Sequence, residues 1–184
     1  VILNNLAKYG SLVKRGSDGR ITSIELRKEN RGTQKSSGLD LNLDLHQIRT
    51  SYGNWHAHLQ GTYMLQSKLQ VNQGDAYISN LGKFVTEGAV PKWRHQLLLD
   101  WQQGAWAAQL SNSYSSAYED QNSAINITDG KRVSNNRVKA YSLWDMSAAY
   151  QLTPSLKLRV GIQNLLDTPP PYSNQAFFFI SGYD

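Results

Sequence analysis

Apolar and polar residues alternate along the chain in one segment after another. From Gly38 onward leucines occupy every odd position up to Leu45, while Asp, Asn and His occupy the even positions. A period of two residues is typical of a β-strand with one apolar and one polar face, and it does not fit the 3.6-residue period of an α-helix. The alternation resumes after a short turn at 50–53 and continues to residue 68, so the two segments predict a hairpin.

Further segments at 91–103, 106–118, 138–152 and 156–162 alternate in the same way. Short turns near residues 51, 103 and 153 join neighbouring segments, whereas long polar connections occupy 70–90 and 119–137. Tight turns on one side and long loops on the other are typical of outer-membrane barrels. The pattern therefore predicts an all-β fold, an antiparallel meander of about seven or eight strands forming part of a transmembrane β-barrel.

Aromatic residues recur eight positions apart on the apolar face of three segments. The pairs are Trp55 and Tyr63, Trp93 and Trp101, and Trp106 and Tyr114. Eight residues at a rise of about 3.3 Å span roughly 26 Å, which a strand tilt of about 40° projects to about 20 Å, near the height of an apolar band between two aromatic girdles. The alternative is that these aromatics fill the core of a soluble β-sandwich or small barrel that binds carbohydrate or a protein partner.

Composition narrows the class of protein further. The 184 residues include 19 Lys and Arg, 14 Asp and Glu, and no cysteine. Without cysteine there is no disulfide, thiolate nucleophile, cysteine-ligated zinc or iron–sulfur cluster. No apolar run approaches the length of about 18–20 residues that a membrane-spanning helix requires. These observations leave a β-barrel open as the membrane-spanning alternative.

Residues 160–175 read VGIQNLLDTPPPYSNQ, and this stretch resembles the C-terminal end of TonB-dependent outer-membrane receptors. In that family a strand ends in Asn-Leu-Phe/Leu-Asp, followed by prolines, an aromatic residue and Ser/Thr-Asn. VKRGSDGRITSIELRKENRG with SGLDLNL at 13–43, VPKWRHQLLLDW at 90–101 and SSAYED at 115–120 also resemble family patterns. The positions that carry the main motif are Asn164, Leu165, Leu166, Asp167, Pro169, Pro170, Tyr172, Ser173 and Asn174.

The resemblance implies that residues 1–184 are the C-terminal portion of a receptor barrel in the outer membrane of a Gram-negative bacterium. Such receptors contact outer-membrane lipid and lipopolysaccharide and take up a scarce ligand, most often a ferric siderophore. Their energy comes from the TonB system through an N-terminal plug. The family ends with one more strand and begins with the plug, whereas this chain runs from Val1 to Asp184. We therefore expect a barrel portion without a plug, truncated before the last strand.

The sequence does not favour an enzyme. It lacks the phosphate-binding, dinucleotide-binding, nucleophile-elbow and zinc-protease motifs, so we predict no catalytic residue and no cofactor. Residues 1–36 hold eight Lys and Arg against three Asp and Glu, which would either attract an anionic ferric chelate or lipopolysaccharide or form a solvated loop. Nucleic acid is not expected as a partner, because these basic residues are not interleaved with stacking aromatics.

Histidines form one candidate site. His46, His56 and His58 share the polar face of the first hairpin, and pairing across it places His46 opposite His56 or His58. Facing imidazoles could hold a metal ion or titrate at about pH 6. The other interpretation is a hydrated wall of the barrel lumen that contacts the plug. The sequence leaves both interpretations open.

Overall fold

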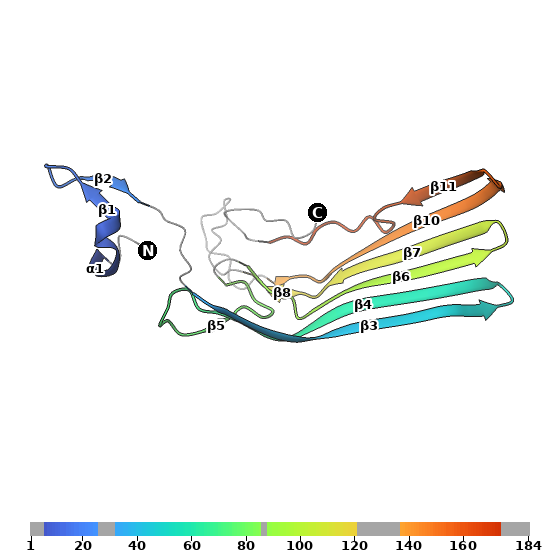
Figure 1. Cartoon of the computed structure of the whole chain (residues 1–184), viewed down its shortest axis with the longest axis horizontal. Coiled ribbons are helices and arrows are strands. Elements are labelled where there is room, and N and C mark those ends of the chain that lie inside the picture. Colours follow the sequence, from blue (N-terminus) through green and yellow to red (C-terminus); the bar gives the residue numbers. More distant parts are fainter. Residues whose placement is uncertain (1–5, 26–31, 86–87, 121–136, 174–184) are drawn as a thin grey trace.

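The computed structural model describes residues 6–25, 32–85, 88–120 and 137–173. Most of them form one long antiparallel sheet (Figure 1), in the order β11-β10-β7-β6-β4-β3, with the short β5 paired to β4. The strands of this sheet are β3 (Gln34–Thr50), β4 (Gly53–Leu69), β5 (Ile78–Ser79), β6 (Trp93–Gln103), β7 (Trp106–Ser115), β10 (Tyr141–Thr153) and β11 (Leu156–Ile162). The predicted all-β meander is confirmed, with seven strands in the main sheet.

Three two-residue turns connect the long strands in pairs. They lie at 51–52, 104–105 and 154–155, and all three are at the right-hand end of the sheet in Figure 1. The described parts of the longer connections after β4 and β7 are at the opposite end (Figure 1). The arrangement of short turns and long connections is as predicted, although residues 121–136 of the second loop lie outside the described residues.

The strand register separates the two kinds of side chain. Leu43 pairs with Leu59, and Leu59 pairs with Leu97, so the leucines of three strands share one face. Asp44 pairs with His58 on the other face. Because side chains directly opposite each other in an antiparallel pair project to the same side, the sheet has one apolar and one polar surface.

No second sheet covers the apolar face within the described part of the chain. Leu39 is 61% exposed, Leu43 is 50% exposed and Val160 is 62% exposed. A β-sandwich would bury one face of each sheet against the other and leave its inner leucines inaccessible. The uncovered face therefore disagrees with the sandwich alternative and fits a portion of barrel wall.

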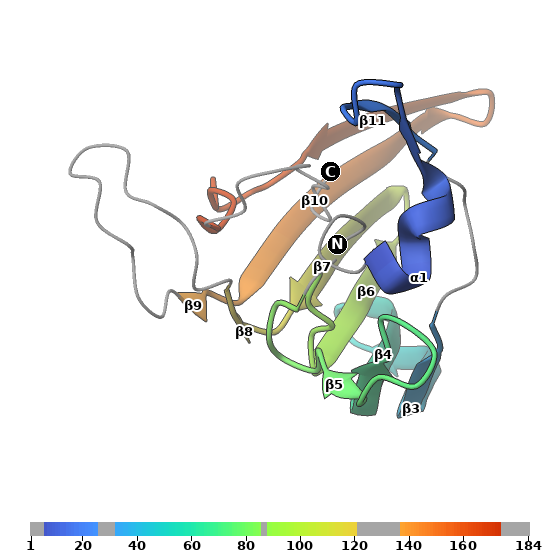
Figure 2. The same ribbon diagram turned by 90° about the vertical axis from the view of Figure 1, so that its left-hand side faces the viewer.

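Smaller elements flank the sheet. At the N-terminal side α1 (Leu6–Tyr9) and the 3-10 turn η1 (Gly10–Leu12) precede a hairpin of β1 (Val13–Arg15) and β2 (Ile21–Ile24). This hairpin stands apart from the main sheet in Figure 1, and in Figure 2 α1 lies in front of the sheet because the view is from the end that carries it. The helix was not predicted, and neither it nor any other described helix is long and apolar enough to cross a membrane.

Two predicted strands are shorter than the alternation indicated. The strand expected over 106–118 ends at Ser115, and the one expected over 138–152 begins at Tyr141. The residues beyond them form a separate pair, β8 (Tyr118–Glu119) with β9 (Arg137–Val138), in which Val138 is fully buried. Alternation continues across both breaks, so the sequence pattern alone did not reveal them.

Candidate functional site

The candidate histidines lie on the polar face of the β3–β4 hairpin, near its turn. Asp44 pairs with His58, but the register shifts between Leu45 and Ile48. His46 and Gln47 therefore both lie opposite His56, as in a β-bulge, and Gln47 adopts a positive φ of 53°. The bulge places the His46 and His56 rings side by side.

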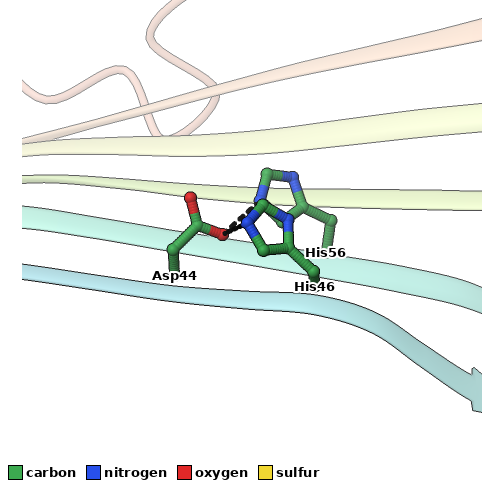
Figure 3. Close-up of side chains that lie close together, drawn as sticks. All are labelled: Asp44, His46 and His56. Carbon is green, nitrogen blue, oxygen red and sulfur yellow. Dashed lines mark hydrogen bonds and ion pairs between the residues drawn. The ribbon is translucent and has the colours of Figure 1, made fainter.

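Asp44 is the centre of this group. Its Oδ1 atom lies 3.0 Å from His46 Nε2 and 2.8 Å from His56 Nε2. The two imidazoles stack with ring centroids 4.9 Å apart and planes 7° from parallel (Figure 3). Two ring nitrogens from neighbouring strands thus converge on one carboxylate oxygen.

A second layer of polar groups orients these side chains. His58 Nδ1 lies 3.1 Å from the other Asp44 oxygen, and His56 Nδ1 lies 3.3 Å from Asp100 Oδ2 on β6. Gln109 Nε2 on β7 donates to Asp100 Oδ1 at 2.8 Å. The network therefore crosses four strands.

The ligand atoms of Asp44, His46 and His56 all lie within 4.8 Å of one another, so this group could hold a metal ion. Imidazole nitrogen with one carboxylate suits divalent ions such as Zn²⁺, Ni²⁺ and Fe²⁺. His58 contacts Asp44 but does not belong to the group of three. The sequence pattern led us to name His58 and to miss Asp44 as a candidate ligand. Asp44 could have been found from its position two residues before His46, on the same face of the strand.

The predicted aromatic girdle residues lie on the leucine face in two bands. Near the short turns, Trp55 packs against Trp101 with ring centroids 6.3 Å apart, and Trp106 packs against Tyr150 at 4.5 Å. Toward the long loops, Tyr63 pairs with Trp93 across β4 and β6, and Tyr114 stacks on His95 with centroids 5.1 Å apart. Tyr150 was not predicted as a girdle residue, although it alternates with the same apolar positions.

Polar side chains join three strands within the long-loop band. Trp93 Nε1 donates to His95 Nδ1 at 2.8 Å, and His95 Nε2 contacts Asn112 Oδ1 at 3.1 Å. The Asn112 amide in turn donates to Ser142 Oγ and to the Leu143 carbonyl. Asn112 is only 4% exposed, so these bonds satisfy a buried amide on an otherwise apolar face.

The NLLD motif forms a turn beyond the last strand of the sheet. β11 ends at Ile162, the last residue of the predicted segment 156–162, so the strand of this chain ends before the motif, unlike the family pattern in which the strand ends in it. Asn164 (φ 51°) starts the turn: its N–H donates to Asp145 Oδ1, and its side chain makes two bonds with the Thr168 backbone. Asn tolerates this left-handed conformation better than most residues, which explains why an asparagine suits the first position of the motif. Pro169, Pro170 and Tyr172 follow the turn, Leu165 N–H donates to the Trp144 carbonyl, and Asn174 lies outside the described residues.

A cluster at the loop end of β3 joins Tyr77 to the strand. The Tyr77 hydroxyl is 2.6 Å from Thr33 Oγ1, and Lys35 Nζ lies 4.6 Å from the centre of the Tyr77 ring. The hydrogen bond with Thr33, and then the positive charge of Lys35, lower the pKa of Tyr77.

Among the other basic residues of 1–36, Arg15 donates to the Gly19 carbonyl and Arg20 pairs with Asp18, whereas 26–31 lie outside the described residues.

The fold and its two-faced sheet define part of a β-barrel wall, and the comparison with known families agrees. Residues 7–165 match the family described as TonB dependent receptor-like, beta-barrel, and the chain belongs to this family. A solved structure of a ferric enterobactin receptor mutant from Pseudomonas aeruginosa is 25% identical, with a TM-score of 0.45. The match covers 71% of this chain and 17% of that receptor chain. No curated protein matches the chain.

Proposed function

We propose that this chain is the C-terminal portion of the barrel of a TonB-dependent receptor in the outer membrane of a Gram-negative bacterium. The receptor takes up a scarce ligand, a ferric siderophore, with energy supplied by the TonB system through an N-terminal plug. The observation that carries the proposal is the long antiparallel sheet with an uncovered leucine face and short turns at one end. Membership of the receptor family adds to it.

The dimensions of the sheet support a place in a membrane. Trp93 and Trp101 stand eight residues apart on β6, which corresponds to about 20 Å of membrane depth at a strand tilt of about 40°. Leucine side chains between the two aromatic bands would contact lipid, and the polar face would line the lumen. The outer edges of β3 and β11 pair with no strand among the described residues, and open edges are not tolerated in lipid. Further barrel strands would pair there.

The long loops would form the ligand-binding side. β3 and β4 are each 17 residues long, whereas about 9–11 residues suffice to cross a bilayer, so their loop ends would extend into the medium. Lys35 and Tyr77 lie at this end. A formal net charge of +5 favours the approach of an anionic ferric chelate or of lipopolysaccharide phosphates.

The proposal is tested by expressing the natural gene product in a Gram-negative host that lacks its own siderophore receptors. Cell fractionation should recover the protein in the outer membrane, and uptake should be measured with ⁵⁵Fe-labelled catecholate and hydroxamate siderophores. We expect accumulation of one chelate that stops when TonB is deleted or the proton gradient is collapsed. Recovery as a detergent-free soluble protein would refute the barrel assignment. Outer-membrane location without TonB-dependent uptake of any of these chelates would refute the ligand class.

A further inference from the structure

We propose that Asp44, His46 and His56 bind a divalent transition-metal ion on the polar face of the β3–β4 hairpin, with Zn²⁺ as the ion to test. His46 Nε2, His56 Nε2 and one Asp44 oxygen would be the three protein ligands (Figure 3). The inference stands on the geometry of these residues and does not depend on which ligand the receptor transports.

The arrangement of His56 is the first argument. Both of its ring nitrogens face carboxylate oxygens, Nε2 facing Asp44 and Nδ1 facing Asp100. A carboxylate oxygen only accepts hydrogen bonds, so each contact requires either a proton or a metal ion on the imidazole nitrogen. With a metal ion at Nε2, the Nδ1–H would donate to Asp100 Oδ2, which is the carboxylate–histidine–metal arrangement that fixes the ring in many metal sites.

The convergence at Asp44 is the second argument. Asp44 Oδ1 lies 3.0 Å from His46 Nε2 and 2.8 Å from His56 Nε2, so both nitrogens contact the same oxygen. In a tetrahedral site with metal–ligand bonds of about 2.0–2.1 Å, ligand atoms lie about 3.3 Å apart, so the Asp44 oxygen would have to move about 0.3–0.5 Å farther from each Nε2. The two stacked rings, 7° from parallel, would have to turn so that both Nε2 atoms point at one ion. Each Nε2 must be free of a proton to bind the ion.

Access and support at the site are the third argument. The His46 side chain is 70% exposed and lies in the bulge, so its ring can leave the stack on His56 and turn toward an ion. Asp44 is held by His58 through its second oxygen, and Asp100 is held by Gln109. The ligands are therefore oriented by a second set of side chains while a fourth coordination position stays open to water.

The test is Zn²⁺ binding to the natural gene product, purified in detergent and stripped with a chelator. Isothermal titration should give one saturable Zn²⁺ site that is lost with Asp44→Asn, His46→Ala or His56→Ala. Asp100→Asn keeps all three ligands and should weaken Zn²⁺ binding by about 10–100-fold, as loss of an orienting group does in other metal sites. Co²⁺ in place of Zn²⁺ should give the visible absorption bands of a four-coordinate site.

The matched control is His95→Ala, which removes a histidine from the apolar face of the same sheet and should leave Zn²⁺ affinity unchanged. Because His46 is largely exposed, His46→Ala should fold, and heat-dependent gel mobility would verify this. Wild-type protein that binds no more Zn²⁺ than a folded His46→Ala/His56→Ala variant would overturn the proposal, as would equal loss with His95→Ala. Iron uptake that persists in a variant without Zn²⁺ binding would separate this site from the transport function.

Discussion

The leucine face of the sheet should contact lipid, and an arginine at Leu43 tests this directly. Leu43 pairs with Leu59, which pairs with Leu97 on β6. Leu97 lies four residues from both Trp93 and Trp101, so Leu43 is midway between the two aromatic bands. Its side chain is half exposed, so an arginine there would meet no packed core.

The size of the effect depends on what covers this face. On a water-exposed surface, Leu43→Arg should change the free energy of unfolding by no more than about 0.5 kcal/mol. At the middle of a bilayer, it should cost about 2–4 kcal/mol, or about 30- to 900-fold in the folding equilibrium. Ile48 pairs with Trp55 in the band near the turns, so Ile48→Arg should cost only about 0–1 kcal/mol.

The assay is denaturant unfolding of the natural gene product in lipid vesicles. The matched control is Asn42→Arg, which introduces the same charge one residue earlier on β3, on the polar face opposite Gln60. We expect Asn42→Arg to be close to neutral. If Leu43→Arg costs no more than Asn42→Arg, the leucine face does not contact lipid and the argument for a barrel wall fails.

Two further variants test local features of the sheet. In Gly61→Ala, the new Cβ would lie 2.3 Å from the Trp93 ring, so the ring must shift, at a cost of about 1–3 kcal/mol in unfolding free energy. Gly161→Ala is its control, because a Cβ there meets nothing closer than 3.5 Å, and equal costs would contradict this packing. Deletion of Gln47 removes a residue at φ 53° and restores regular pairing of Ile48 with Trp55, so stability in the vesicle assay should stay the same or rise. Failure of that variant to assemble would show that the bulge is required.

The sheet and its two faces could be predicted because both depend on local order along the chain. Strand side chains alternate with a period of two, and a one-residue slip would turn every leucine to the polar side. With the two-residue turn at 51–52 alone, Leu43 would lie opposite Gln60. The extra residue of the bulge at 46–47 shifts the register by one and pairs Leu43 with Leu59, as the parity of the leucines requires. Two of the turns could also be predicted from their glycines, because Gly53 and Gly104 adopt a positive φ, a conformation that glycine tolerates best.

The candidate site was predicted only in part, because it depends on register between strands that long loops connect. Asp100 contacts His56 only because β6 pairs with β4 in one register, and the connection between those strands spans more than 20 residues. Nothing in the local pattern fixes that register. The bulge did leave a signal, since His46 and Gln47 are two consecutive polar residues between Leu45 and Ile48. An extra residue is what returns Ile48 to the apolar face.

The polar cluster follows from the same alternation that forms the leucine face. Each strand that presents leucines on one side must present its other residues on the opposite side, and in β3, β4 and β6 those include Asp44, His56 and Asp100. Carboxylates gathered on a partly shielded wall are stable only when cations or proton donors partner them. Imidazoles of the same sheet are such partners for these carboxylates. A divalent ion bound by Asp44, His46 and His56 would balance the negative charge of Asp44 more completely. Because these side chains lie near the short turns and away from the long loops, the site should keep its chemistry whatever ligand the loops select.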